Sequence, residues 1–362
     1  MNATEPGPAA AGLALAERTA RRFGIQALAC EALGSTLYAG LLRHAAQDRL
    51  AGGPVAAVVD GHEADPGRAA LALRMLGGVH ALVLTGQAEE LAAFYPSAGG
   101  TADPGAGAER AWPALRRVLD RLREQVRGWL TRPPQTNEVG RGAALAGALC
   151  WLAGEADLPV RLVEIGASAG LNLRADQFRI TGEGAGFGPE SSPVQMAGCW
   201  LGRPPPARPV TVLSRTGGDL TPIDPLSEDG RLRLEAYVWP DQLARFGRLR
   251  GALELARQVP AELRAEPASA TVGGLRLEPG TWTVLWHSIM AQYLDEAETE
   301  AIAAGVAAIA ATASESARFA HVSLELVRGT RDTPVQVASW PGGVRRVLGT
   351  APPHGVPVTW TA

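Results

Sequence analysis

Apolar residues in the N-terminal third of the chain recur at the spacing of an α-helix. One stripe consists of Leu115, Val118, Leu122, Val126 and Trp129. Arginines occupy the positions between them, so the segment has one apolar face and one solvated face. Residues 34–50 and 67–76 are rich in Ala and Leu in the same manner. The pattern predicts a mainly helical N-terminal domain over residues 1–133.

The helical pattern stops at residues 131–134, Thr-Arg-Pro-Pro. Proline restricts its own backbone and that of the residue before it, so a domain boundary is expected here, with a second domain over residues 134–362. Thr136 or Asn137 can cap a new helix, and Glu138 places an anion in its first turn. This helix is expected to end near Gly154.

Beyond residue 160, short apolar runs alternate with helical patterns. One expected strand begins at Arg161, and three others cover residues 210–213, 281–286 and 319–326. The expected helices cover residues 240–255 and 294–311. Such alternation indicates a doubly wound α/β domain with a parallel sheet. Three further apolar runs, at 335–338, 344–348 and 358–360, are broken by Gly and Pro and predict terminal antiparallel strands.

The first expected strand leads into a glycine-rich turn, Glu164-Ile-Gly166-Ala-Ser168-Ala-Gly170. Small residues let the backbone approach a ligand closely, and the helix that follows offers free N–H groups. The carboxylate of Glu164 at the strand end can accept a hydrogen bond from an amine or a hydroxyl. The turn therefore predicts a site for a small ligand.

Composition narrows the possible ligands and partners. The chain has 362 residues, a net charge of -3 and 46% hydrophobic residues, which is typical of a globular protein. This charge favours neither nucleic acid nor an anionic membrane surface as a partner. All 34 basic residues are arginines. Without lysine the chain can contain neither a Walker A phosphate loop nor a pyridoxal Schiff base.

The cysteines and the N-terminus bear on the compartment. Cys30, Cys150 and Cys199 are widely spaced and odd in number, which favours free thiols in a reducing compartment. The first residues show no secretory signal, and no apolar stretch reaches the length of a membrane span. A cytoplasmic protein is expected.

The glycine-rich turn resembles the first motif of class I S-adenosylmethionine-dependent methyltransferases, an acidic residue followed by alternating glycines. Glu164, Gly166 and Gly170 match the motif, and Ser168 replaces its central glycine with another small residue. The resemblance implies a Rossmann-like domain that binds S-adenosylmethionine as cofactor and methylates a small molecule.

Other interpretations of the turn remain open. Gly166-Ala-Ser168-Ala-Gly170 is also a literal G-x-S-x-G, the nucleophile elbow of α/β-hydrolases. An acid and a histidine follow in the order that such enzymes use, and the candidates are Asp219, Asp224, His287, His321 and His354. Helix rather than several strands precedes the turn, which argues against a hydrolase. Another possibility is a tight turn that uses glycine for packing alone. A methyltransferase-like fold that is used for binding or for another reaction is a further alternative.

A methyltransferase also needs an acid after its second strand to accept from the ribose hydroxyls of the cofactor. Asp219 follows the strand at 210–213, provided that residues 182–209 are an insertion; Glu183 is nearer in sequence but lacks a clear strand before it. Arg141 is a candidate for the methionine carboxylate, or else forms a surface ion pair with Glu138.

His287 and Ser288 lie at the C-terminal end of a predicted central strand, where α/β sheets place their chemistry. His287 is the expected general base, with Tyr293 nearby. The predicted catalytic residues are thus His287 and Tyr293. The predicted cofactor-binding residues are Glu164, Gly166, Ser168, Gly170, Asn172, Asp219, Arg141 and Ser288. No metal site is predicted, because His62-Glu63 lacks the second histidine of a zinc-protease motif.

Several other segments carry a wider resemblance that extends over nearly the whole chain. They are residues 34–38, 95–97, 135–141, 164–173, 219–224 and 238–242. Together they resemble a bacterial family of uncharacterised proteins, domain-of-unknown-function family 2332. That resemblance implies a methyltransferase-like fold and no particular activity.

Overall fold

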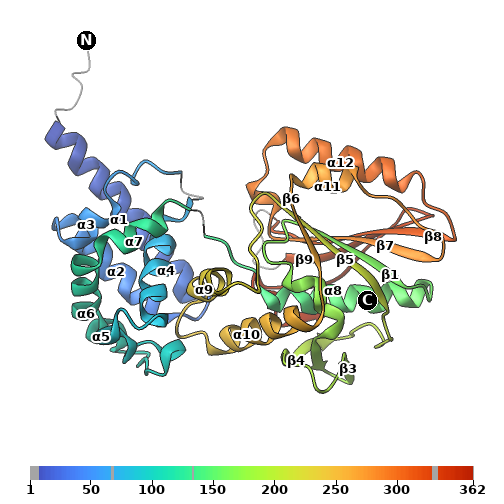
Figure 1. Ribbon diagram of the computed structural model, residues 1–362, viewed down its shortest axis with the longest axis horizontal. Coiled ribbons are helices and arrows are strands. Elements are labelled where there is room, and N and C mark those ends of the chain that lie inside the picture. Colours follow the sequence, from blue (N-terminus) through green and yellow to red (C-terminus); the bar gives the residue numbers. More distant parts are fainter. Residues whose placement is uncertain (1–7, 67–68, 133, 328–332, 362) are drawn as a thin grey trace, which may run out of the picture. The chain divides into compact units, whose positions relative to one another are not determined.

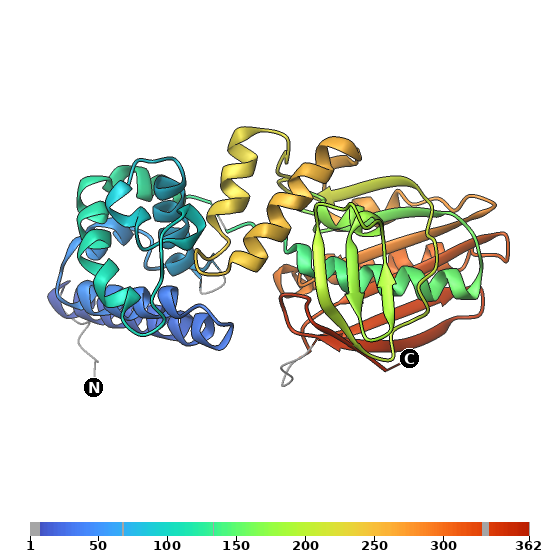
Figure 2. The same cartoon turned by 90° about the horizontal axis from the view of Figure 1, so that it is seen from below.

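The computed structural model describes residues 8–66, 69–132, 134–327 and 333–361. The chain divides into two compact units. The helical unit comprises residues 1–136 and 232–246, and the sheet unit comprises residues 137–231 and 247–362. Figure 1 and Figure 2 show the helices of the first unit and the large β-sheet of the second.

The helical unit confirms that the N-terminal region is helical. Its helices are α1 (Pro8–Ala32), α2 (Thr36–Leu50), α3 (Pro54–Val59), α4 (Leu71–Leu84), α5 (Glu89–Ala92), the 3-10 helix η2 (Pro96–Ala98), α6 (Gly107–Arg121) and α7 (Arg123–Leu130). Leu115 and Val118 on α6 and Val126 on α7 are fully buried. The predicted stripe is split into two helices at Leu122, whose φ of -111° and ψ of 32° depart from helical values.

Residues 232–246 belong to the helical unit although they lie far along the chain, which the sequence pattern did not indicate. Trp239 is buried in the core of that unit. Asp241 accepts hydrogen bonds from Ser35 Oγ (2.6 Å) and Leu37 N (3.1 Å) at the start of α2. The expected domain boundary follows Pro133, which is outside the described residues. It lies close to the division between the two units at residues 136 and 137.

The sheet unit contains eleven strands in one sheet. They are β1 (Val160–Ile165), β2 (Arg179–Gly182), β3 (Ala185–Phe187), β4 (Gln195–Gly202), β5 (Val212–Asp219), β6 (Glu262–Ala265), β7 (Thr281–Ser288), β8 (Ala317–Leu324), β9 (Thr333–Trp340), β10 (Val344–Ala351) and β11 (Val358–Trp360). Their order is β3-β2-β4-β11-β10-β9-β8-β7-β1-β5-β6. Strands β6, β5, β1, β7 and β8 are parallel, and β8 to β11 pair antiparallel. The expected α/β class and mostly parallel sheet are confirmed.

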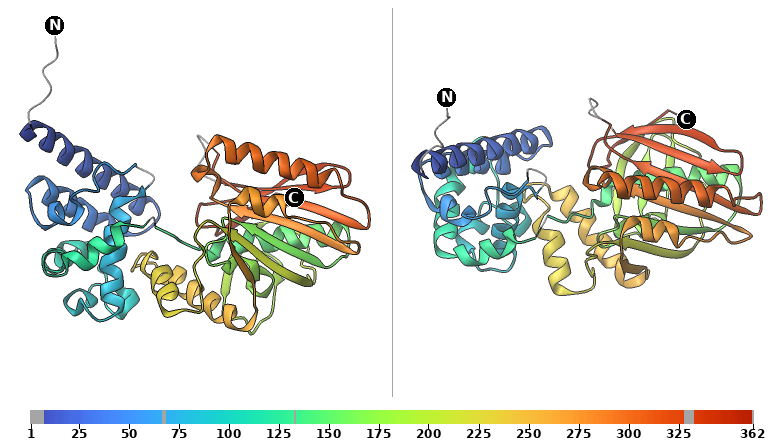
Figure 3. Two further views of the ribbon diagram at one scale, coloured as in Figure 1. Left: turned by 45° about the horizontal axis from the view of Figure 1, so that its top comes forward. Right: turned by 90° about the horizontal axis from the view of Figure 1, so that it is seen from above.

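Helices cover both faces of this sheet, as Figure 3 shows for α11 and α12 on one side. The helical elements of the sheet unit are η3 (Val139–Arg141), α8 (Gly142–Glu155), η4 (Leu171–Gln177), α11 (Ala268–Gly273), η5 (Ala291–Tyr293) and α12 (Glu296–Ala310). Two further helices, α9 (Glu228–Ala236) and α10 (Leu243–Gln258), each have residues in both units. Below α11 and α12, Ile165, Leu285 and Phe319 of the sheet pack against Val272 and Ile302 of the helices. Burial of this apolar face holds the helices on the sheet.

The Gly- and Pro-rich stretch 182–209 adds β3 and β4 to the sheet. β4 pairs with β11 in parallel, with Trp200 opposite Val358 and Trp360 opposite Gly202, two residues further along. The two indoles pack edge to face at 5.8 Å, and Trp200 Nε1 donates to Ala143 O (3.0 Å). The insertion therefore extends the sheet without displacing its parallel half. No helix among the described residues is long and apolar enough to cross a membrane.

Candidate functional site

The glycine-rich turn leaves the C-terminal end of β1 with three residues in the left-handed region. Gly166 has φ 65°, Ser168 φ 53° and Gly170 φ 62°. Glycine adopts this conformation freely, whereas for serine it is strained by about 1 kcal/mol or more. The backbone of Ala167 donates to Gly218 O (3.1 Å), which fastens the turn to the end of β5.

The two glycines are also needed for packing. A Cβ on Gly170 would lie 2.7 Å from Leu263 Cδ2, and one on Gly166 would lie 2.9 Å from Met290 Cβ. Side chains therefore approach the turn closely on both sides. Part of the glycine pattern is explained by this packing alone.

Asp219 is the last residue of β5 and lies beside the turn, as the second-strand acid was expected to lie. Its Oδ2 accepts from Ser168 N (2.8 Å) and its Oδ1 accepts from Thr221 N (2.9 Å). The carboxylate thus holds Ser168 in its strained conformation. Glu183, the other candidate, lies away from the turn in the β2–β3 hairpin, where it accepts from Gly202 N (3.0 Å).

Residues 137–141 contact both the glycine-rich turn and the end of β7. Asn137 Oδ1 accepts from Leu171 N (2.7 Å), and Glu138 O accepts from Asn172 Nδ2 (3.2 Å). Arg141 donates from Nη1 to Ser288 O (3.3 Å), at the end of β7, and from Nε to Pro353 O (3.0 Å). The segment therefore ties the turn after β1 to the end of β7.

Glu164 lies at the centre of these contacts and is 2% exposed. Burial raises the pKa of its carboxyl to about 8, and the neighbouring Trp286 indole and Arg141 guanidinium offset only part of that rise. No described residue hydrogen-bonds its Oε2, and the same is true of Ser168 Oγ. Buried polar atoms without a partner cost free energy, so two such atoms beside a strained turn indicate a place where a ligand can bind.

His287, the expected base, is joined to two partners that the sequence did not single out as a set. Its Nδ1 lies 2.8 Å from Glu325 Oε1, and its Nε2 lies 2.9 Å from His321 Nε2. Glu325 also accepts from Met290 N (3.1 Å) and Ala291 N (3.3 Å). We call Glu325, His287 and His321 the histidine relay.

The pairing of β7 and β8 produces the relay. His287 pairs with Ser323, and Leu285 pairs with His321. Residues two apart on a strand share one face, so His321 and Glu325 flank His287 diagonally from the neighbouring strand. Burial lowers the pKa of His321 to about 3, with the charges of His287 and Arg345 as further causes.

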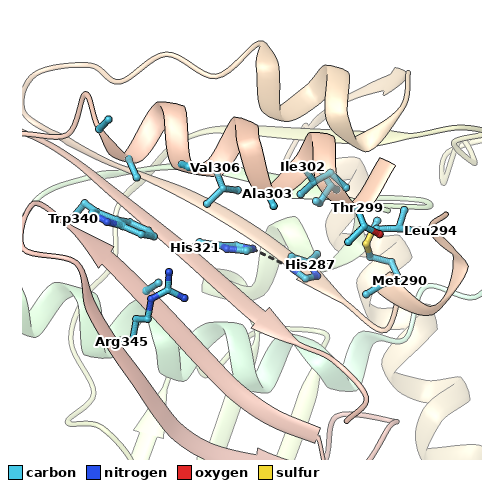
Figure 4. A pocket seen from close by; sticks show the side chains of 16 residues that line it. His287, Met290, Leu294, Thr299, Ile302, Ala303, Val306, His321, Trp340 and Arg345 are labelled. Carbon is cyan, nitrogen blue, oxygen red and sulfur yellow. Dashed lines mark hydrogen bonds between the residues drawn. The ribbon is translucent and has the colours of Figure 1, made fainter. Parts of the chain in front are cut away.

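His287 and His321 of the relay line a groove of about 650 Å³ between α12 and the sheet. Figure 4 shows His287 and His321 along its floor, with Trp340 and Arg345 at one end and Met290 and Leu294 at the other. Ile302, Ala303 and Val306 of α12 form the opposite wall. A concave, mostly apolar volume with a few polar groups is typical of a small-molecule site.

Ser288 and Tyr293, two of the predicted site residues, lie in different surroundings. Ser288 is buried at the end of the strand, and its carbonyl binds Arg141. Tyr293 is 60% exposed on η5 and is not among the residues lining the groove. Between them, Ile289 has φ 51°, a conformation that a β-branched residue rarely adopts. Both strained non-glycine residues of the sheet unit thus follow the ends of β1 and β7.

Sequence reasoning missed Glu325, Arg345 and Asn137 as site residues and named His321 only as a possible hydrolase histidine. The alternation His321-x-Ser323-x-Glu325 was a usable signal for polar groups on one face of a strand. Arg345 offered no such signal, because its place in the groove follows from the register of β10 on β9. Among the described residues, no cluster of three or more His, Cys, Asp or Glu side chains could hold a metal ion.

Residues 20–360 match the model of a family described as an uncharacterized protein conserved in bacteria, DUF2332. The chain belongs to this family. The match spans residues of both the helical unit and the sheet unit. No curated protein and no solved structure matches the chain.

Proposed function

We propose that this DUF2332 protein is an S-adenosylmethionine-dependent methyltransferase that acts on a small molecule. The observation that carries the proposal is the meeting of three features at one edge of the sheet. These are the strained glycine-rich turn after β1, the acid Asp219 after β5 and the histidine relay after β7.

The strand order supports this interpretation. β1 lies between β5 and β7 in the parallel part of the sheet, so the chain reverses its direction of winding at β1. In doubly wound, Rossmann-like sheets, ligands bind at the carboxyl ends of the strands on either side of this point. Glu164, Asp219 and His287 all lie at or near these strand ends.

The chemistry of the side chains fits the amino-acid part of the cofactor. Glu164 is a buried carboxyl with one unpaired oxygen, and an ammonium group beside it would favour its charged form. Arg141 acts electrostatically on Glu164 and can serve the carboxylate of the same ligand. Asp219 ends β5 beside the turn, where its carboxylate is placed to accept from the ribose hydroxyls of the cofactor.

When bound, S-adenosylmethionine supplies a methyl group on a sulfonium that a nucleophile can attack. Glu164, Arg141 and Asp219 would bind and orient the cofactor, and Asn137 would hold the turn in place. The relay would accept the proton that the substrate nucleophile loses. Catalysis would come mainly from positioning, since methyl transfer needs the reacting atoms in line.

A serine hydrolase remains the second candidate because Ser168 has the positive φ of a strained turn within G-x-S-x-G. Its geometry is less favourable. Ser168 Oγ has no hydrogen bond to any described histidine, and the Nε2 atoms of His287 and His321 bind each other. Labelling with a fluorophosphonate that is lost in Ser168→Ala would support a hydrolase.

Calorimetry with S-adenosylmethionine and S-adenosylhomocysteine tests the proposal. We expect both to bind the wild-type protein, and Glu164→Gln and Asp219→Asn each to weaken binding about ten-fold or more. Glu164→Gln removes the carboxylate that pairs with the ligand ammonium, and Asp219→Asn removes the charged acceptor for the ribose hydroxyls. Glu183→Gln is the matched control, since it changes a carboxylate away from the turn and should leave binding unchanged. No binding of either compound to the wild-type protein would refute the proposal.

A further inference from the structure

The hydrogen bonds of the histidine relay have one consistent direction. Glu325 accepts from two backbone N–H groups, so the third contact, with His287 Nδ1, is one in which the imidazole donates. A neutral His287 that donates from Nδ1 accepts at Nε2, so His321 must donate from its own Nε2. The lone pair at the far end of the relay therefore belongs to His321 Nδ1.

That lone pair lies at the groove. His321 is one of the groove residues, and no described residue hydrogen-bonds its Nδ1. The charged and titratable groups near it are His287 and Arg345, while α12 contributes Thr299 as the polar side chain of the opposite wall. The low pKa of His321, about 3, keeps the ring neutral near neutral pH, so its Nδ1 presents a lone pair to the groove.

Arg345 supplies the second polar feature of the groove. It pairs with Ala338 across β9 and β10, and both residues line the groove. No carboxylate among the described residues lies within ion-pair distance of its guanidinium. Most of the other groove side chains are apolar, among them Ile165, Leu294 and Trp340. Arg345 is exposed at one end of the groove, and a guanidinium there without an anionic partner suits a ligand that brings its own anion.

We propose that the groove binds an apolar, aromatic carboxylic acid that also carries a hydroxyl group. Arg345 binds the carboxylate, and His321 Nδ1 accepts the proton of the hydroxyl. Glu325 and His287 are positioning residues, which hold the His321 tautomer that leaves Nδ1 unprotonated. The assignment of this ligand as the methyl acceptor rests on the proposed function, whereas its binding and deprotonation do not.

The reaction balances as an O-methylation. The substrate O–H bond breaks and its proton passes to His321 Nδ1 while the Nε2 proton of His321 passes to His287 Nε2, so the positive charge lies on His287 beside the Glu325 carboxylate. The substrate oxygen forms a bond to the methyl carbon while the carbon–sulfur bond of the cofactor breaks, and the sulfur keeps that electron pair. The products are the methyl ether, S-adenosylhomocysteine and a proton, which His321 releases to water.

The test uses 6-hydroxy-2-naphthoate as the probe, because its absorption spectrum reports whether its hydroxyl is protonated. 2-Naphthol lacks the carboxylate and 2-naphthoate lacks the hydroxyl, so the three compounds separate the two contacts. With the full-length protein we expect 6-hydroxy-2-naphthoate to bind at least ten-fold more tightly than 2-naphthol. We also expect the bound probe to lose its proton at a lower pH than the free probe.

Variants assign the two contacts. Arg345→Gln should weaken binding of both naphthoates about ten-fold and leave 2-naphthol unaffected. Arg346→Gln is the matched control, because Arg346 is the next arginine on β10, outside the groove residues. In His321→Leu the probe should bind but stay protonated. In Glu325→Gln the pH of deprotonation should rise while the affinity for 2-naphthoate stays the same.

Nitrogen-15 spectra give a readout that needs no ligand. Protons are expected on Nδ1 of His287 and on Nε2 of His321, and Glu325→Gln should change this pattern. The proposal is overturned if the naphthoates fail to bind, if Arg345→Gln and Arg346→Gln behave alike, or if the bound probe stays protonated as the free probe does. Failure of the cofactor to bind would refute only the methyltransferase, since the naphthoate measurements are made without it.

Discussion

Two histidines, one in each unit, have pKa values lowered by burial but differ in their surroundings. His80 in the helical unit is fully buried, and burial lowers its pKa to about 4. Its Nδ1 contacts Ala236 O (3.1 Å) and its Nε2 contacts Ser97 Oγ (2.7 Å). His321 in the sheet unit has one bonded nitrogen and lines a groove. A shifted pKa therefore marks burial in both, and only an open nitrogen beside a cavity marks a candidate site.

The comparison predicts a large difference in stability between two matched substitutions. His80→Leu removes a hydrogen-bond partner from the buried Ala236 carbonyl and from the half-buried Ser97 hydroxyl, so it should lower the free energy of unfolding by about 3 kcal/mol. His321→Leu removes one hydrogen bond from an apolar groove and should cost less than about 1 kcal/mol. Chemical denaturation measures both. Equal losses would mean that the two histidines are alike in role.

Glu164 is an acid whose pKa is also shifted by burial, but upward. Its pKa in the folded protein, about 8, lies above the ordinary value of 4.5, so the native state holds an extra proton between these pH values. Stability is therefore fully present below pH 4.5 and falls as pH rises toward 8. Glu164→Gln removes this dependence, and at pH 8 it should be more stable than the wild type by about 2 kcal/mol. Denaturation at both pH values tests the sign, and parallel curves would contradict it.

For the histidines, stability falls as the pH falls, which is opposite to the pH dependence expected for Glu164. The folded pKa values, about 4 for His80 and about 3 for His321, lie below the ordinary 6.5, so the unfolded state binds protons first. Their contribution is present above pH 6.5 and is lost as pH falls, by up to about 1.4 kcal/mol per pH unit for each histidine. His321→Leu should make the loss between pH 6.5 and 4 shallower. An unchanged slope would show that His321 is not a neutral, buried group.

The smallest effects concern the strained residues. Ser168 in the sheet unit and Ala70 in the helical unit both have positive φ, 53° and 48°. Glycine at either position should relieve strain and raise stability by at most about 1 kcal/mol. Thermal unfolding measures this gain. If the strain at Ser168 serves the ligand site, Ser168→Gly should also weaken S-adenosylmethionine binding, whereas Ala70→Gly should not.

Much of the sheet unit could be predicted because its elements are local patterns. The strand that contains Glu164, the turn at Gly166 and the strand that contains His287 all lie within a few residues of their expected positions. Asp219 was placed after the second strand because a Gly-rich stretch marked the strand end. The grouping of residues 232–246 with the helical unit had no local signal, because it depends on Trp239 and Asp241 meeting residues far away in sequence.

By itself, the sequence determined the alternation of strands and helices, the glycine-rich turn and the absence of lysine chemistry. These follow from residue spacing and from which side chains exist at all. Only the tertiary structure brought Glu325 and His321 to His287 and turned Arg345 into the same groove. Strand register made those contacts, and register is set by how whole strands bury their apolar faces rather than by any one residue.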